Sequence, residues 1–184
     1  MDAAAAFRRA RGGFVERGRR VTADQWSQPT PCTEWDVRAL VNHVAGEYLW
    51  VTEMLAGRTI ADVGDRLDGD ILGDDPAQAL ADAQRAAVAA LDEPGALSRT
   101  VHLSFGDTPA GTYATQMTID SVIHAWDLAR ATGGDEVFDP DLVELAYTEL
   151  QGSAEDWRSA GAFGPETTPA DDSTMAKLLA LAGR

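Results

Sequence analysis

A carboxylate and an imidazole lie four residues apart within an apolar helical stripe, and this feature limits the possible folds most strongly. Asp120 and His124 share one helix face, because residues i and i+4 lie one turn apart. The other members of the stripe are apolar or aromatic: Tyr113, Met117, Leu128 and Ala131. Such a stripe points into a core, where an unpaired polar group costs roughly 1–3 kcal/mol or more. The fold must therefore supply a partner to this face.

His43 is the candidate partner from a second helix. The clearest helical pattern in the chain starts near Thr33, the predicted N-cap, and stops at Gly57. Two histidines and one carboxylate form a three-ligand metal set with open coordination positions, which suits zinc and also non-haem Fe(II). In the alternative, both histidines only pack and Asp120 pairs with an arginine. Spacing alone favours this alternative, because Asp-x-x-x-His is a weak motif.

The remaining elements predict one all-α domain over residues 1–184, with four or five antiparallel helices and a short β-hairpin before the fourth. Periodicity and turn residues place the other segments as follows: helices over 3–20, from Pro76 to Pro94, over 112–132, from Pro140 through Trp157 and around 175–181; an exposed connection over 58–75; and hairpin strands over 100–105 and 108–112.

Charge and composition exclude several classes of partner. The 184-residue chain carries a formal net charge of −15, which argues against nucleic acid and anionic membranes as partners. Its N-terminal basic residues are expected on the exposed face of the first helix: Arg8, Arg9, Arg11, Arg17, Arg19 and Arg20. The sequence has no signal-peptide pattern and no apolar run of about 18 residues. With a single cysteine, Cys32, the chain suits the reducing cytoplasm.

Other polar residues near the predicted ligands have more than one interpretation each. Glu47, four residues after His43, is either the carboxylate ligand in place of Asp120, a proton acceptor, or a polar group on a pocket wall. Asp127 either orients the His124 imidazole or pairs with Arg130 or Arg38. Cys32 is expected to be a buried, inert thiol rather than a reactive one, and His102 is expected at the surface.

Two blocks of the sequence resemble the mycothiol-dependent maleylpyruvate isomerase N-terminal domain family. The first block comprises residues 31–44, PCTEWDVRALVNHV, and the second comprises residues 119–133, IDSVIHAWDLARATG. The C-terminal segments FGP at 163–165 and LLALAGR at 178–184 are similar to the short actinobacterial members. One departure is Asp120, because the family's characterised isomerase has glutamate there.

The resemblance implies a DinB-like antiparallel four-helix bundle that binds a divalent metal through His43, Asp120 and His124. Zinc is the expected metal, with nickel, iron or manganese as alternatives. It further implies a cytoplasmic thiol S-transferase or isomerase whose partners are mycothiol or a similar thiol and an electrophilic small molecule. Glu47 or Asp127 is then expected to carry a proton, and Arg38 or Arg130 to bind a carboxylate of substrate or cofactor. The competing hypothesis is a metal-stabilised binding or regulatory bundle without turnover, and a homodimer is one candidate assembly.

Overall fold

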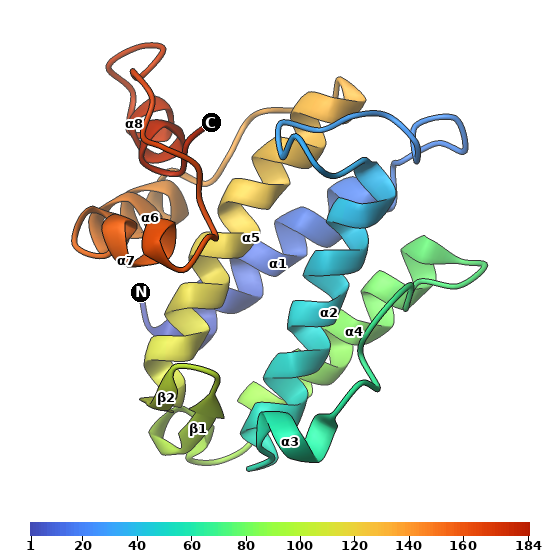
Figure 1. Cartoon of the computed structure of the whole chain (residues 1–184), viewed down its shortest axis with the longest axis vertical. Helices are drawn as coiled ribbons and strands as arrows, with labels where there is room; N and C mark the ends of the chain where they lie inside the picture. The colour runs from blue at the N-terminus through green and yellow to red at the C-terminus, as the bar shows by residue number, and fades with distance from the viewer.

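The protein is mostly helical, with one small antiparallel hairpin (Figure 1). The computed structural model describes all residues 1–184. The long helices are α1 (Ala3–Gly18), α2 (Val37–Leu55), α4 (Pro76–Leu91), α5 (Ala110–Thr132) and α6 (Pro140–Gln151). The short elements are α3 (Ile60–Val63), the 3₁₀ helix η1 (Ala96–Ser98), β1 (Thr100–Leu103), β2 (Gly106–Pro109), α7 (Ala154–Ser159) and α8 (Thr174–Leu181). None of these helices is long and apolar enough to cross a lipid bilayer.

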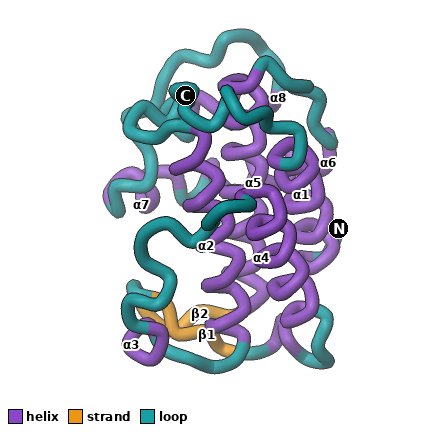
Figure 2. The backbone as a smooth tube through the Cα atoms, turned by 90° about the vertical axis from the view of Figure 1, so that its right-hand side faces the viewer, coloured by secondary structure: helices purple, strands orange, loops and turns teal.

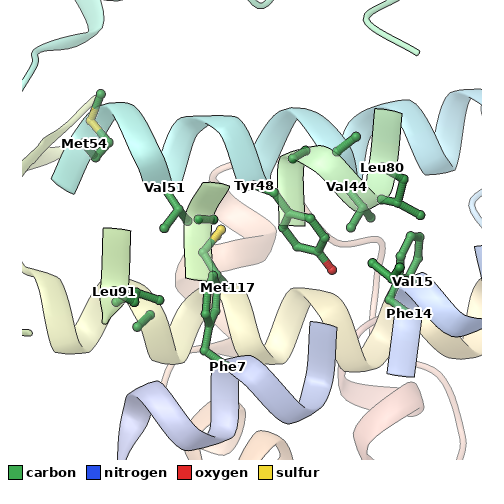
Figure 3. Packing of buried hydrophobic residues seen from close by; sticks show 14 of the residues in the cluster. Phe7, Phe14, Val15, Val44, Tyr48, Val51, Met54, Leu80, Leu91 and Met117 are labelled. Atoms are coloured by element: carbon green, nitrogen blue, oxygen red, sulfur yellow. The ribbon is translucent and has the colours of Figure 1, made fainter. Parts of the chain in front are cut away.

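Helices α1, α2, α4 and α5 surround the larger of two hydrophobic clusters. Helix α1 packs mainly on α5, and α2 packs mainly on α4. Figure 3 shows side chains from these helices meeting in the interior, with Tyr48 of α2 and Met117 of α5 among them. A second cluster joins α1 and α5 to α6 and α8. The hairpin and α3 lie at the opposite end of the molecule from α8 and the C-terminus (Figure 2).

The N-cap of helix α2 lies three residues later than predicted. Asp36, not Thr33, is the N-cap, since its carboxylate accepts a 2.8 Å hydrogen bond from the backbone N–H of Ala39. The residues before it are held in a loop, where Asp36 forms an isolated β-bridge with Pro29. The predicted N-cap at Thr33 is therefore wrong, and the correct cap fixes the direction in which α2 leaves this loop.

Three other boundaries differ from prediction. The connection over 58–75 contains the one-turn helix α3, whose capping box joins Thr59 and Asp62. The return strand of the hairpin is Gly106–Pro109, so α5 begins at Ala110. The helix predicted to run through Trp157 ends at Gln151, and α7 starts afresh after Gly152 and Ser153. Helix α7 is therefore a separate element and not the end of α6.

Arg11 is buried, contrary to the prediction that it lies on the exposed face of the first helix. It follows Phe7 by four residues and precedes Phe14 by three, so it belongs to the apolar stripe of α1. Its guanidinium stacks over the rings of Phe7 and Tyr48, at 4.1 and 3.7 Å from their centroids. Nη2 donates to the carbonyl of Gln84, while Nε and Nη1 have no partner. Burial lowers the pKa of Arg11 to about 10.

Replacing Arg11 with methionine is expected to leave the protein equally stable or to raise its free energy of unfolding by about 1–3 kcal/mol. A buried charge without a carboxylate loses several kcal/mol of hydration, and a flexible apolar side chain fills the same space. Urea unfolding of Arg11→Met beside Arg8→Met, an exposed position on the same helix, measures the difference. A loss of more than about 2 kcal/mol, confined to Arg11→Met, would show that stacking on the two rings outweighs desolvation.

Candidate metal centre

Helices α2 and α5 bring the three predicted ligands together. His43 lies in the first half of α2, and Asp120 and His124 lie near the middle of α5. The two helices are tied beside the site by a buried contact of 3.3 Å between the Tyr48 hydroxyl and Ser121 Oγ. Each residue is presented by a rigid helix rather than a loop, which favours a well-defined ligand geometry.

The donor atoms of the three residues converge on one point. Asp120 Oδ1 lies 3.6 Å from His43 Nε2 and 3.3 Å from His124 Nε2. The set offers one ligand atom from each residue, all within 4.8 Å of one another. No oxygen of Glu47 belongs to this group. The carboxylate in the cluster is therefore Asp120, and Glu47 stands outside the set.

These residues fit a divalent metal on two grounds. Asp120 Oδ2 is buried and has no hydrogen-bond partner, so the carboxylate retains a free lone pair in the interior. In addition, tetrahedral zinc with ligands at about 2.0–2.1 Å separates neighbouring donor atoms by roughly 3.3 Å, close to the two spacings at Asp120. Two imidazoles and one carboxylate leave at least one coordination position open. The donor types alone do not select zinc over nickel, iron or manganese.

Asp127 orients His124 from behind. The Nδ1 atom of His124 lies 2.9 Å from Asp127 Oδ2, and Asp127 is fully buried. When Nδ1 carries the proton and donates it to Asp127, Nε2 is left free to bind a metal. This contact is the one that the predicted orienting role of Asp127 requires. Its cationic partner, however, is neither Arg130 nor Arg38.

Arg184 is the partner of Asp127, a contact that no local sequence pattern indicates. Its guanidinium donates to both carboxylate oxygens of Asp127, with Nε 2.9 Å from Oδ1 and Nη2 2.9 Å from Oδ2. Only 7% of the Arg184 side chain is exposed. A line of contacts therefore runs from the C-terminal residue through Asp127 to His124. Arg184 follows Asp127 by 57 residues, so helical periodicity cannot predict the pair.

Cys32 lies beside the same guanidinium, and the prediction that its thiol is buried is wrong, while its inertness stays a prediction. It is partly exposed, and its Sγ is 2.7 Å from Arg184 Nη2 and 3.5 Å from Asp127 Oδ2. Cys32, His124 and Asp127 also place donor atoms within 4.8 Å of one another. The Arg184 cation already neutralises the carboxylate of Asp127, which disfavours a second metal between these three residues. Nearby, Trp35 covers the ligands, with its ring centroid 4.6 Å from that of His43.

The pKa values of Asp120 and His124 depend on two opposing effects, burial and the charges of neighbouring side chains. Burial would raise the pKa of Asp120, but His124 and His43 together lower it well below its usual value. Burial would lower the pKa of His124, but Asp120 above all raises it well above 6.5. Without a metal, the two residues therefore form a charged pair. A metal must displace the His124 proton to bind, so metal binding releases protons.

Glu47 occupies the edge of this cluster, one helical turn beyond His43. Burial, followed by the negative charge of Asp120, raises the pKa of Glu47 to about 7. A carboxyl group with this pKa both accepts and releases a proton near neutral pH, which suits a proton carrier. The role of Glu47 as a proton carrier stays a prediction.

Arg38 and Arg130 lie apart from the ligands. Arg38 donates to Asp70, and Arg130 donates to Glu136 and stacks over Trp126. Their predicted role in binding a carboxylate of substrate or cofactor stays a prediction. His102 is partly exposed on the hairpin and pairs with Asp107.

Comparison with known protein families matches residues 7–129 to the Mycothiol maleylpyruvate isomerase N-terminal domain. The matched segment includes the three predicted ligands and Asp127. It covers the whole first sequence block, residues 31–44, and the second block as far as residue 129. The chain belongs to this family. The match leaves Arg184 outside, so the guanidinium behind Asp127 comes from a part of the chain beyond the shared segment.

Two relatives of this family member come from strains of Mycobacterium tuberculosis. They are Uncharacterized protein MT0763 and Uncharacterized protein Rv0738. Each is 36% identical to this chain over 142 residues, which cover 77% of this chain and 74% of the relative. No solved structure shows a significant match.

Stability of the metal-free family member is expected to fall by at least about 2 kcal/mol as the pH rises from about 5 to 9. The folded pKa values of Glu47 and His124 are both raised above their ordinary values of 4.5 and 6.5. Between the ordinary and the raised pKa the folded state binds more protons, so its stability decreases as pH increases. Asp120 and Asp127 have lowered pKa values, and they affect stability only below about pH 4.

Thermal unfolding in the presence of a chelator, repeated across this pH range, measures the trend. The stabilisation added by Zn²⁺ should change in the opposite direction and grow with pH, because the metal competes with the His124 proton. The double variant Glu47→Gln/His124→Gln is the control and should have a flatter metal-free profile. A metal-free protein that becomes more stable toward pH 9 would contradict the raised pKa values.

Proposed function

We propose that this protein is a cytoplasmic, divalent-metal-dependent enzyme that acts with a low-molecular-weight thiol of the mycothiol type, as a thiol S-transferase or isomerase. We also propose that α1, α2, α4 and α5 constitute a DinB-like antiparallel four-helix bundle, with the metal held by His43, Asp120 and His124. Family membership supports the thiol, and the helical core supports the bundle.

The convergence of three donor atoms from two helices carries this proposal. Asp120 Oδ1 is within 3.6 Å of both histidine nitrogens, and Asp120 Oδ2 has no protein partner. A structural zinc site is closed by four protein ligands, whereas this set has three. The missing fourth ligand favours chemistry at the centre over a purely structural metal.

The residues around the centre have separable tasks. A divalent cation bound there supplies Lewis acidity, because a thiol that coordinates such a cation loses its proton. Glu47 would accept that proton, and the thiol sulfur would add to one carbon of an activated C=C bond of the substrate, breaking its π bond. Glu47 would return the proton to the neighbouring carbon to give the thioether conjugate of a transferase. In an isomerase, rotation about that carbon–carbon bond and cleavage of the new sulfur–carbon bond would restore the double bond and release the thiol. Asp127 and Arg184 hold the imidazole of His124, and Trp35 shields the ligands from water.

The alternative function is a metal-stabilised binding or regulatory bundle without turnover. One observation favours it: Glu47 lies one helical turn from His43, so a rotamer change could make it a fourth ligand. A site closed in this way would resemble structural zinc centres. The two functions differ in whether an exogenous thiol reaches the metal.

A thiol titration of the cobalt-substituted protein separates the two functions. We expect mycothiol to add a sulfur-to-cobalt charge-transfer band and to change the d–d spectrum at a ratio of one thiol per cobalt. The Cys32→Ser variant is the matched control, and it should give the same response because Cys32 contacts the Nδ1 side of His124, away from Nε2. A spectrum that stays unchanged at saturating mycothiol would favour the binding bundle.

A further inference from the structure

An apolar cavity adjoins the candidate metal centre. Its volume is about 690 Å³, within the range of small-molecule sites. Side chains from α2, α5, α7 and the hairpin line it, and ten of its fifteen lining residues are hydrophobic. Four of these are aromatic: Trp50, Phe105, Tyr113 and Trp157. A cavity of this size has room for a two-ring molecule.

The cavity lies one helical turn from the predicted ligands on both α2 and α5. Glu47, one turn beyond His43 on α2, forms part of its wall. Met117, one turn before Asp120 on α5, forms another part. The raised pKa of Tyr113, caused by burial and then by the charges of Glu47 and Asp120, reflects the same proximity. A molecule in the cavity therefore has one end beside the carboxyl group of Glu47.

The charge of the wall restricts what can bind. The lining residues include no lysine, arginine or histidine, and their ionisable groups are Glu47, Asp156 and the phenol of Tyr113. A carboxylate placed here would lose its hydration without gaining a cationic partner, at a large cost. The carboxylates of Glu47 and Asp156 would also repel it when ionised.

We propose that this cavity is the substrate pocket and that it takes an uncharged, predominantly apolar molecule, not a carboxylate or dicarboxylate. The assignment rests on the proposed function and deepens it, since the end of the molecule beside Glu47 is the part that would meet the thiol. The apolar body lies among the aromatic side chains. Phe105, in the hairpin turn and 72% exposed, forms the rim with Ile60, which is 40% exposed. A bound apolar molecule would cover both side chains.

Two probes with the same ring system, one neutral and one anionic, test the selectivity of the cavity. Methyl 2-naphthoate is neutral, and 2-naphthoate carries one carboxylate on the same ring system. Fluorescence titration at pH 7.5 should give a Kd for the ester at least about tenfold below that for the acid, as expected from desolvation of an unpaired carboxylate. Equal affinities, or tighter binding of the acid, would overturn the proposal.

Variants of the lining locate the bound probe and test the charge argument. Phe105→Ser should weaken binding of the ester about tenfold, whereas Val137→Ser, at a site 76% exposed and outside this cavity, should not change it. Gln116→Arg places a cation in the wall and should tighten binding of the acid at least about tenfold. Unchanged Kd values in both Phe105→Ser and Gln116→Arg would mean that the probe binds elsewhere, which overturns the proposal.

Repeating the titrations on the His43→Ala variant keeps this test separate from the proposed function. The ester should bind His43→Ala and the wild-type protein with Kd values within about threefold of each other, since His43, Asp120 and His124 do not line the cavity. The probe affinities therefore test the pocket assignment alone. The cobalt spectra test the thiol function, independently of the probe affinities.

Discussion

Replacing Asp120 with asparagine is expected to weaken Zn²⁺ binding by more than about 100-fold, while Asp120→Glu should retain the metal. Loss of a residue that hydrogen-bonds to a metal ligand typically weakens metal binding about 10–100-fold, and loss of a charged ligand itself should weaken it more. The asparagine side chain would keep an oxygen near His43 and His124 but would remove the negative charge that neutralises a divalent cation. Competition with a chromophoric chelator at constant pH measures the affinity.

Glu47→Gln is the matched control, since it removes the other carboxylate near His43. We expect its Zn²⁺ affinity to stay within about tenfold of the wild-type value, because no Glu47 oxygen belongs to the convergent set. If Glu47→Gln lost the metal and Asp120→Asn kept it, the carboxylate ligand would be Glu47. In that case α2 would supply two of the three ligands, His43 and Glu47, and α5 would supply only His124.

Removing the carboxylate of Asp127 is the second change with a large expected effect. Asp127→Leu should lower the free energy of unfolding by about 3–5 kcal/mol, because it leaves Arg184 as a buried charge without its partner. It should also weaken metal binding by about 10–100-fold, because His124 loses the acceptor that orients its ring. Urea unfolding and chelator competition measure the two effects separately.

A double-mutant cycle with Arg184→Met isolates the interaction between the two residues. Asp127→Leu/Arg184→Met leaves neither charge unpaired, so it should cost about 2 kcal/mol less than the sum of the single changes. Arg130→Met is the control, because that guanidinium is exposed and pairs with Glu136; its effect should stay within about 0.5 kcal/mol. Additive single changes would mean that Arg184 does not act through Asp127.

Local sequence patterns identified the three residues that the structure brings together, but not their surroundings. Asp120 and His124 stand out because a helix repeats every 3.6 residues, so a spacing of four places both on one buried face. That His43 faces them depends on how α2 and α5 pack, which the resemblance supplied and the structure shows. The contact of Arg184 with Asp127 depends on the path of the whole C-terminal segment, for which no short-range rule exists.

Arg11 was misplaced for a different reason, because its position could have been read from the sequence. Its spacing from Phe7 and Phe14 places it within the apolar stripe of α1, but its charge led to the prediction of an exposed side chain. The structure shows that two aromatic rings can accommodate a guanidinium in the core. Periodicity was the better guide than residue type at this position.

The most direct test of the metal centre is the metal content of the purified protein. Elemental analysis should find about one equivalent of zinc or another transition metal per wild-type chain, and less than about a tenth of that in His43→Ala and in His124→Ala. His102→Ala, which alters the remaining histidine, on the hairpin and paired with Asp107, should retain the full equivalent. Metal absent from the wild-type protein even after reconstitution, or retained in His43→Ala and His124→Ala, would contradict a metal centre built by α2 and α5.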